Sequence, residues 1–410
     1  MNIMKKSIRY LFYGLFMVFL LQGCLPLKMV LDKNKIWVGT WGTAPQLIEP
    51  HNMPPAPGLS NNTIRQIVRV SIGGDVLRLR FSNAFSKGPV ELASVAIAQP
   101  VEGSLIDMST QKVLTFNKNK SVTMAPGGEV LSDQVDFDLK PGSLLAITIY
   151  FGVTSPDVTG HPGSRTTSFI LPGNNISSFD FAGAVKTDHW YVINGIDVLT
   201  SGSAKAIAIL GNSITDGRGS GTNKQNRWPD ILSERLLKNP ETRNIGVLNM
   251  GIGGNCVLRG GLGPTAIDRF DRDVLSQSNV RWLIILEGIN DIGGIRNPES
   301  AEKIAQELIN AYDDMITKAH AQNIRVFGAT ILPFAKSFYD TEFRQSARNI
   351  VNEWIRNSGR FDAVIDFDKI MRNPNDIKTI LLDMHDNDFL HPNEAGYEKM
   401  GNSIDLSLFN

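Results

Sequence analysis

A serine that directly follows an apolar run is the first residue whose type and position could do chemistry. Residues 211–217 read GNSITDG and come after the apolar run 206–210, which places Ser213 at the end of a buried strand. Such a serine can aim its Oγ at a substrate while nearby backbone N–H groups stay free for an oxyanion. Because position 215 is threonine, the segment is not the Gly-x-Ser-x-Gly elbow of the α/β-hydrolases. We therefore interpret Ser213 as a candidate nucleophile.

An aspartate and a histidine near the C-terminus could supply the base that a serine needs. Residues 386–392 read DNDFLHP and precede a helical pattern. A catalytic histidine needs a hydrogen-bond acceptor on its second ring nitrogen, and Asp388 lies three residues before His391, within reach on the same loop. Asp383 and Asp386 are also close in sequence, so Asp388 is a choice among three carboxylates that rests on the spacing Asp-x-x-His.

Two further segments contain glycine and asparagine after apolar runs. Residues 249–255 read NMGIGGN and residues 287–291 read EGIND. Glycines at a strand end let backbone N–H groups approach a substrate oxygen, and an asparagine amide can donate to the same oxygen. Each segment alone would favour a tight turn that has no role in chemistry.

The second half of the chain carries the elements that would position these residues. From residue 204 onward, apolar runs alternate with helical patterns, as expected for parallel strands that helices cover on both faces. The expected strands are 206–210, 282–286 and 326–331, and the expected helices are 300–322 and 341–358. The pattern predicts a doubly wound α/β domain, whose site would lie at the carboxyl ends of the strands.

The first half has a different pattern, in which short alternating runs are interrupted by turn residues. Residues 68–72 and 76–81 flank the turn 73–75, which predicts a β-hairpin. Further runs such as 144–151 extend this pattern. We expect an antiparallel β-sandwich domain before the α/β domain.

The four motifs, in this order and spacing, resemble the four blocks of the SGNH (GDSL-type) hydrolases across residues 204–410. The resemblance implies a flavodoxin-like parallel sheet and a carboxylic-ester hydrolase that needs no metal and no cofactor.

The resemblance also implies roles for individual residues. Ser213 is expected to be the nucleophile, and Asp388 and His391 are expected to complete a catalytic triad. The oxyanion hole is expected to consist of the backbone N–H groups of Ser213 and Gly254 and the side chain of Asn290.

One residue departs from the family pattern, because Asn212 stands where an aspartate usually precedes the nucleophile. Asparagine has nearly the same shape and its carbonyl oxygen can still accept backbone hydrogen bonds, but it carries no charge. The departure leaves the effect of Asn212 on activity open.

The substrate class is less constrained than the reaction. Residues 37–46 read WVGTWGTAPQ and resemble the opening of bacterial two-domain SGNH proteins that include acetylxylan-esterase-like members. Lys plus Arg and Asp plus Glu both number 41, so no long-range field favours nucleic acid. We expect an acetylated carbohydrate; the alternatives are a lipid or small-molecule ester, or a non-catalytic surface glycan-binding lipoprotein.

The N-terminus has the pattern of an export signal. Basic residues precede the apolar run 10–21, which is shorter than the ~20 residues of a membrane span. Residues 21–24 read LQGC and resemble the lipobox of bacterial lipoproteins, which implies lipidation of Cys24. Cys256 would then have no disulfide partner, and its lack of a nearby histidine argues against a catalytic role.

These patterns divide the chain into four parts and predict its location. We expect a signal peptide at 1–23, a tether at 24–35, a β-sandwich domain at 36–203 and an SGNH hydrolase domain at 204–410. The protein is expected to be exported and lipid-anchored to the bacterial envelope, at the periplasmic face or the cell surface.

The anchor is tested by Cys24→Ser, which removes the thiol that would carry the lipid. We expect the variant to leave the membrane fraction or to accumulate as unprocessed precursor, as measured by fractionation and intact mass. A wild-type mature protein that begins at Cys24 but carries no lipid mass would contradict the lipoprotein assignment.

Overall fold

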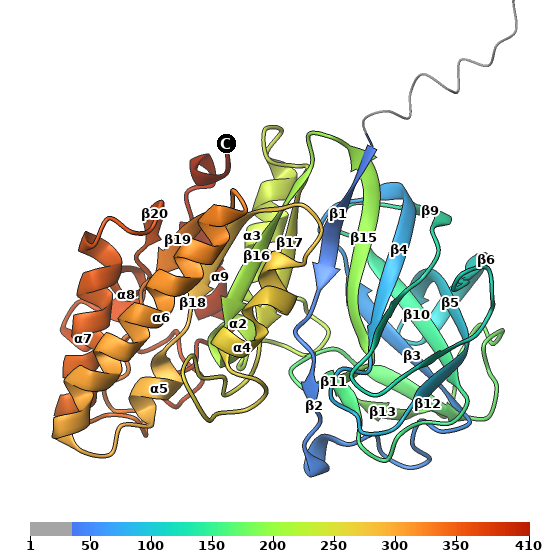
Figure 1. The fold of residues 1–410 in the computed structure, drawn as a ribbon, viewed down its shortest axis with the longest axis horizontal. Helices are drawn as coiled ribbons and strands as arrows, with labels where there is room; N and C mark the ends of the chain where they lie inside the picture. The colour runs from blue at the N-terminus through green and yellow to red at the C-terminus, as the bar shows by residue number, and fades with distance from the viewer. Residues whose placement is uncertain (1–34) are drawn as a thin grey trace, which may run out of the picture.

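The computed structural model describes residues 35–410. The predicted signal peptide, Cys24 and all but the last residue of the predicted tether lie outside the described residues. Figure 1 shows a β-rich region beside a region of helices and parallel strands; β15 (Ile193–Ser201) ends the first and β16 (Lys205–Gly211) begins the second. Among the helices of residues 35–410, none is both long and apolar enough to cross a lipid bilayer.

The N-terminal region consists of antiparallel sheets that pack around apolar side chains, as predicted for its fold class. In spatial order, one sheet contains β1 (Lys35–Gly42), β15, β4 (Gly74–Ser82) and β8 (Glu129–Leu131), with β9 (Val135–Leu139) also paired to β4. The larger sheet contains β13 (Val185–Thr187), β12 (Ser168–Pro172), β3 (Asn62–Arg69), β10 (Leu144–Phe151), β5 (Val90–Glu102) and β6 (Leu105–Val113), with β7 (Val122–Met124) paired to β5. A small sheet contains β14 (Trp190–Tyr191), β11 (Thr159–His161) and β2 (Gln46–Leu47).

The predicted hairpin between residues 68–72 and 76–81 is wrong. β3 pairs with β10 and β12, whereas β4 pairs with β15, β8 and β9 in the other sheet. The segment between β3 and β4 crosses from one sheet to the other, because Val70 N donates to Ser143 O and Ser71 N donates to Thr40 O. Residues 76–81 do lie within β4, but of residues 68–72 only 68 and 69 belong to a strand, at the end of β3. Alternating polarity carried no information on strand partners.

The C-terminal region is a doubly wound α/β fold, as predicted. Its five parallel strands have the order β17 (Ile245–Gly251), β16, β18 (Val280–Leu286), β19 (Arg325–Ala329) and β20 (Ala363–Ile365). The first strand in the chain is thus second in space, which is the flavodoxin-like order. The helices are α2 (Ser213–Asp216), α3 (Trp228–Lys238), α4 (Ala266–Phe270), α5 (Ile289–Gly293), α6 (Ala301–Ala321), α7 (Glu342–Asn357), α8 (Phe367–Met371) and α9 (Glu394–Ser403). A short antiparallel pair, β21 (Arg372–Asn373) and β22 (Asp376–Ile380), follows α8.

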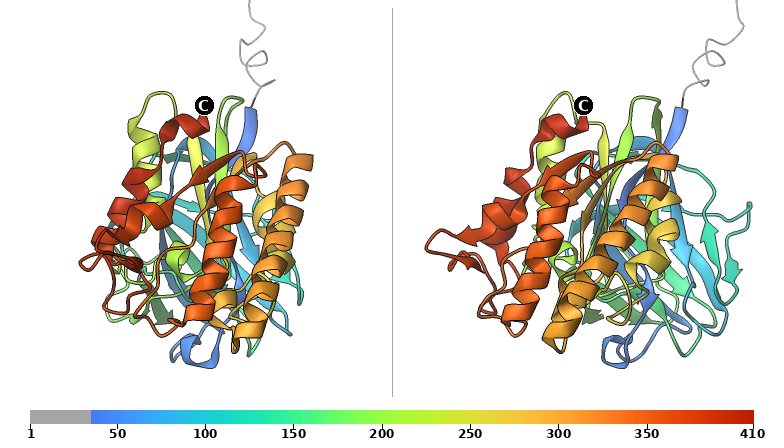
Figure 2. Two further views of the ribbon diagram at one scale, coloured as in Figure 1. Left: turned by 90° about the vertical axis from the view of Figure 1, so that its left-hand side faces the viewer. Right: turned by 60° about the vertical axis from the view of Figure 1, so that its left-hand side comes forward.

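Alternate residues of the central strand β16 serve opposite layers of helices. Ala206 and Ala208 belong to the apolar cluster that includes α6 and α7, while Ile207 and Ile209 belong to the cluster that includes α3 and α9. Figure 2 shows α6 and α7 side by side. Both faces of the sheet are therefore covered, which explains the continuous apolar runs in the sequence.

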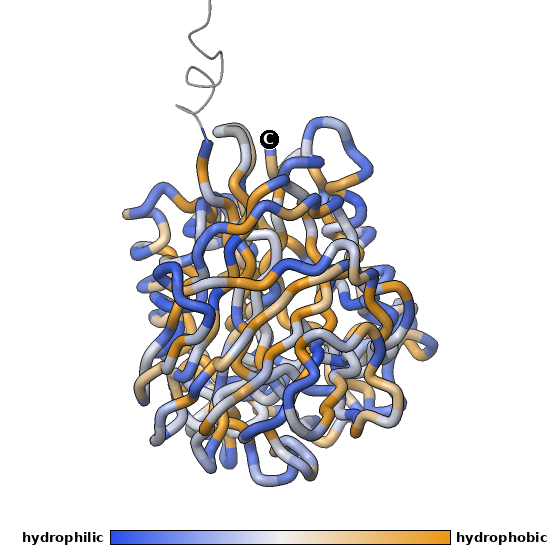
Figure 3. The backbone as a smooth tube through the Cα atoms, turned by 90° about the vertical axis from the view of Figure 1, so that its right-hand side faces the viewer, coloured by the Kyte–Doolittle hydropathy of each residue, from blue (hydrophilic) through white to orange (hydrophobic). Residues whose placement is uncertain are grey.

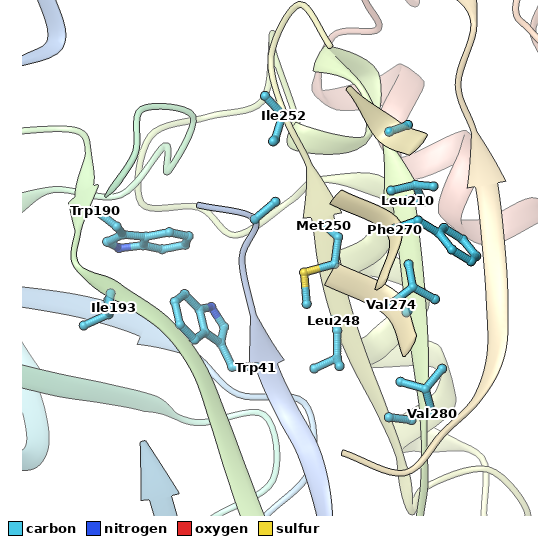
Figure 4. Close-up of a cluster of buried hydrophobic side chains, with 14 of the residues drawn as sticks. Trp41, Trp190, Ile193, Leu210, Leu248, Met250, Ile252, Phe270, Val274 and Val280 are labelled. Atoms are coloured by element: carbon cyan, nitrogen blue, oxygen red, sulfur yellow. The ribbon is translucent and has the colours of Figure 1, made fainter. Parts of the chain in front are cut away.

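The two regions share one apolar core. Figure 4 shows the rings of Trp41 and Trp190 on one side and Leu248 and Met250 of β17 on the other. At Gly39 of β1 a Cβ atom would lie 2.9 Å from the Leu248 side chain, so the strands approach closely there. In Figure 3, hydrophobic segments run through the strands at the centre of the view. This packing holds the N-terminal region against the edge of the parallel sheet.

The same arrangement brings loops of the N-terminal region to the carboxyl ends of the parallel strands. In Figure 1, α2 follows the end of β16, and β2 and β11 lie toward the same end of the molecule. The side chains of His161, in β11, and Asp216, in α2, are 2.9 Å apart. A site at these strand ends therefore has walls from both regions.

Candidate active site

The serine motif forms the junction between β16 and α2. Asn212 caps the helix, because its Oδ1 accepts a hydrogen bond from Ile214 N at 3.1 Å. Ser213 is the first helical residue and is buried. Its Oγ lies 2.9 Å from Nε2 of His391.

The loop before α9 supplies the histidine and its carboxylate. Nδ1 of His391 lies 2.6 Å from Oδ2 of Asp388, and Asp388 Oδ1 accepts from the backbone N–H groups of His391 and Leu390 at 2.9 and 3.0 Å. Burial opposes ionisation of Asp388, but the hydrogen bonds from His391 and Leu390 outweigh it and hold the pKa of this carboxyl well below its usual range. Within residues 35–410, the carboxylates of Asp383 and Asp386 make no hydrogen bond to the ring.

These contacts determine which atom can act as a base. An ionised carboxylate only accepts, so Nδ1 of His391 carries the proton toward Asp388. Nε2 is then an acceptor, and the hydroxyl of Ser213 donates to it. The arrangement can therefore remove the proton from Ser213 Oγ.

Three potential N–H donors line the same cavity as Ser213 Oγ. The backbone N–H groups of Ser213 and Gly254 donate to no other group within the described chain. Gly254 has φ +70°, a left-handed conformation that favours glycine. The amide of Asn290 donates through Nδ2 to Asn255 O at 2.7 Å, which leaves its second N–H available. Gly254, Asn290, Ser213 and His391 line one cavity of about 350 Å³.

Tyr339 orients the Asn290 amide, and no sequence motif indicated this residue. Its hydroxyl donates to Asn290 Oδ1 at 3.0 Å. The carbonyl end of the amide is thereby fixed, and the NH₂ end is directed away from Tyr339. Because the two residues are 49 positions apart and Tyr339 lies in a loop, no local pattern could have linked them.

A buried arginine connects the loops that carry these groups. Arg269, in α4, donates to Gly211 O at 3.0 Å, to Met250 O at 2.6 Å and to Asn255 Oδ1 at 3.0 Å. It also pairs with Asp273 at 3.1 Å. The guanidinium thus fixes the ends of β16 and β17 and the segment after Gly254. No sequence motif indicated Arg269.

The side chain of Asn212 also contacts a second carboxyl group beneath the serine. Its Nδ2 donates to Glu287 Oε2 at 3.2 Å, and Arg269 lies 3.5 Å from Glu287 Oε1. Burial raises the pKa of Glu287 to about 8, although Arg269 acts in the opposite direction. The neutral asparagine supplies a donor at a place where an aspartate would bring another carboxylate.

The N-terminal region forms part of the cavity wall. Gln46, Glu49 and Arg165 line the cavity together with Ser213 and His391. The contact between the regions is polar as well as apolar, because the His161–Asp216 pair is buried beside this wall.

Cys256 lies outside this arrangement. It is a free, buried thiol, and burial raises its pKa to about 12. A thiol that stays protonated near neutral pH is a poor nucleophile.

Comparison with known proteins relates the C-terminal region to one family. Residues 209–399 match the GDSL-like lipase/acylhydrolase family. Similar solved structures include a GDSL-like lipase from Bacteroides thetaiotaomicron, with 20% sequence identity, a TM-score of 0.36 and coverage of 50% of this chain and 88% of that one. A variant of an acetylxylan esterase from Geobacillus stearothermophilus has 18% identity, a TM-score of 0.38 and coverage of 49% and 92%. No curated protein sequence matches the chain. The family match includes all four motifs.

Asn212→Asp tests the contact with Glu287. The folded-state pKa of Glu287 is raised, so its contribution to stability is full below its ordinary pKa and is lost as the pH rises through about 8. In Asn212→Asp, a second buried carboxyl stands beside Glu287, and the stability should therefore fall more steeply as the pH rises. We expect the stability deficit of the variant to grow from about pH 5 to about pH 8, and to reach on the order of 3 kcal/mol at the upper end.

Denaturant unfolding of wild type, Asn212→Asp and Glu287→Gln across this pH range measures the effect. Glu287→Gln keeps the shape and removes the titration, so its stability should vary less with pH than that of wild type. A deficit of Asn212→Asp that does not change with pH would mean that the two side chains do not interact.

Proposed function

We propose that this protein, whose residues 209–399 match the GDSL-like lipase/acylhydrolase family, is a carboxylic-ester hydrolase that acts through an acyl-enzyme on Ser213. The observation that carries the proposal is the continuous hydrogen-bonded series from Ser213 Oγ through His391 to Asp388. Such a series activates a serine hydroxyl that is otherwise a weak nucleophile.

In the acylation step, Ser213 Oγ attacks the ester carbonyl carbon while its proton passes to His391 Nε2. The carbonyl oxygen gains negative charge, and the N–H groups of Ser213, Gly254 and Asn290 stabilise it. The bond to the leaving alcohol then breaks, and His391 returns the proton to the alcohol oxygen. Asp388 keeps the imidazole in the required tautomer and stabilises its protonated form.

In the deacylation step, water takes the place of the alcohol. His391 accepts a proton from the water as its oxygen attacks the acyl carbon, and the same N–H groups hold the oxyanion. Collapse of this intermediate releases the carboxylic acid and returns the proton to Ser213. The cycle needs no other group.

The proposed substrate is the O-acetyl ester of a carbohydrate. The cavity at Ser213 is lined by polar side chains, including Gln46, Glu49 and Arg165, which can bind hydroxyl groups. The chain has equal numbers of acidic and basic residues, 41 of each, which suits a neutral partner.

A second candidate is an ester with a longer acyl chain. A further hollow of about 670 Å³ shares Gly254, Asn290 and Tyr339 with the serine cavity and also includes Ile295 and Ile304. An acyl chain that leaves the oxyanion donors in this direction would meet apolar surface.

Export and lipid anchoring through Cys24 complete the proposal. They rest on the basic start, the apolar run 10–21 and the LQGC sequence at 21–24. An anchored enzyme would act on esters near the membrane surface.

The roles of Ser213 and Asp388 are tested by substitution. On p-nitrophenyl acetate, we expect Ser213→Ala to abolish turnover and Asp388→Asn to lower kcat by about 10⁴-fold, because the imidazole is then held in the wrong tautomer. Asp386→Asn is the matched control and should keep near-wild-type turnover. Wild-type turnover in Asp388→Asn, with loss in a neighbouring aspartate variant, would show the assignment to be wrong.

The acyl preference is tested with p-nitrophenyl esters of increasing chain length. We expect kcat/KM to fall by about tenfold or more between the acetate and the octanoate, because the hollow that would take the added methylenes carries the polar side chains of Arg259, Arg296 and Asn297 beside its isoleucines. An increase of kcat/KM with chain length would favour the second candidate.

A further inference from the structure

Polar side chains of the N-terminal region face the catalytic serine across the cavity. Gln46, Glu49, Asn52 and Arg165 all line the cavity that contains Ser213. The proposed chemistry uses none of them. They are therefore available to contact a substrate.

The carboxylate of Glu49 is held in a fixed position. Its Oε1 accepts from Gln46 Nε2 at 2.6 Å and its Oε2 accepts from Asn52 Nδ2 at 3.0 Å. The backbone of Asn52 is itself held, because its backbone carbonyl oxygen accepts a hydrogen bond from the hydroxyl of Tyr191 at 2.9 Å. Each carboxylate oxygen has a further acceptor site, so Glu49 can accept hydrogen bonds from a ligand.

Arg165 offers donors that the protein itself does not use. Within residues 35–410, its Nε is buried without a hydrogen-bond partner and its guanidinium forms no ion pair. The backbone around it is fixed, because Arg165 O accepts from Asn223 N at 2.9 Å. A buried donor without an acceptor is costly, and a ligand oxygen would remove that cost.

The serine cavity and the adjoining hollow lie on different sides of the oxyanion donors, which separates the acyl part of the ester from its alcohol part. Beyond the donors Gly254 and Asn290, the adjoining hollow is lined only by residues of the α/β region. The side chains of the N-terminal region are in the serine cavity, together with His391, which protonates the leaving alcohol. The alcohol therefore meets the N-terminal region.

We propose that Arg165 and Glu49 form a subsite that binds hydroxyl groups of the alcohol part of the ester, and that this alcohol is a sugar. A sugar hydroxyl both donates and accepts, so neighbouring hydroxyls can satisfy the carboxylate of Glu49 and the guanidinium of Arg165 at the same time. The two charges are of opposite sign, which favours a neutral polyol. This inference rests on the proposed ester hydrolysis and assigns substrate selection to the N-terminal region.

Two acetyl esters with different alcohols isolate the subsite. p-Nitrophenyl acetate has the same acyl group as partially acetylated xylo-oligosaccharides but no sugar hydroxyls. Arg165→Gln and Glu49→Gln should each raise KM for the saccharide by about tenfold, the usual scale for a lost hydrogen bond to a charged group. On p-nitrophenyl acetate, kcat/KM of both variants should stay within about twofold of wild type.

The matched control is Arg243→Gln. Arg243 is exposed and precedes β17, at the amino end of the parallel sheet and so at the opposite edge from Ser213. It should leave the kinetics on both substrates unchanged. Melting temperatures of all variants separate loss of binding from loss of folding.

A binding measurement removes the chemistry altogether. In a Ser213→Ala background, calorimetry with the acetylated oligosaccharide should give a Kd about tenfold weaker when Arg165→Gln is added.

Equal losses on both esters, or unchanged saccharide kinetics and binding, would overturn the subsite. A wild-type enzyme that hydrolyses p-nitrophenyl acetate but no acetylated saccharide would also overturn it, while the mechanism on Ser213 would stand. A wild-type enzyme that hydrolyses neither ester would contradict both.

Discussion

The hydrogen bonds of Arg269 are the interaction on which the geometry of the site depends. One fully buried guanidinium holds Gly211 O, before the serine, together with Met250 O and the side chain of Asn255. Burying a charge costs several kcal/mol, so removal of its partners would leave a large penalty. Asp273 compensates the charge, and Glu287, whose pKa is raised by burial, lies 3.5 Å from the guanidinium. In this cluster a neutral Asn212 satisfies Glu287 without adding a third carboxyl.

The site is divided between the two regions of the chain. The α/β region carries the serine, the base and the N–H donors, and the N-terminal region covers the other side of the cavity. The shared core around Trp41 and Met250 and the His161–Asp216 contact keep the two in a fixed relation. The N-terminal region is thus a wall of the site. On the proposal that this wall binds the alcohol part of the ester, changes in its loops would alter substrate selection without changing the chemistry.

The sequence predicted what is local and missed what depends on the tertiary fold. Buried parallel strands are recognisable because both of their faces are apolar, and the motif residues follow them directly. Strand partners in the antiparallel sheets were not predictable, as the mistaken pairing of β3 with β4 shows. Arg269, Tyr339 and Arg165 are single polar residues whose partners lie far away in sequence.

The central claim is that Ser213 is the nucleophile, and covalent labelling tests it most directly. An organophosphonate ester reacts with a serine whose hydroxyl is activated by a histidine and whose oxyanion is stabilised. We expect the intact mass to increase by one phosphonyl group, ester hydrolysis to be lost in proportion, and peptide mapping to find the adduct on Ser213. An adduct on another residue, or full hydrolytic activity in protein labelled at Ser213, would contradict the account.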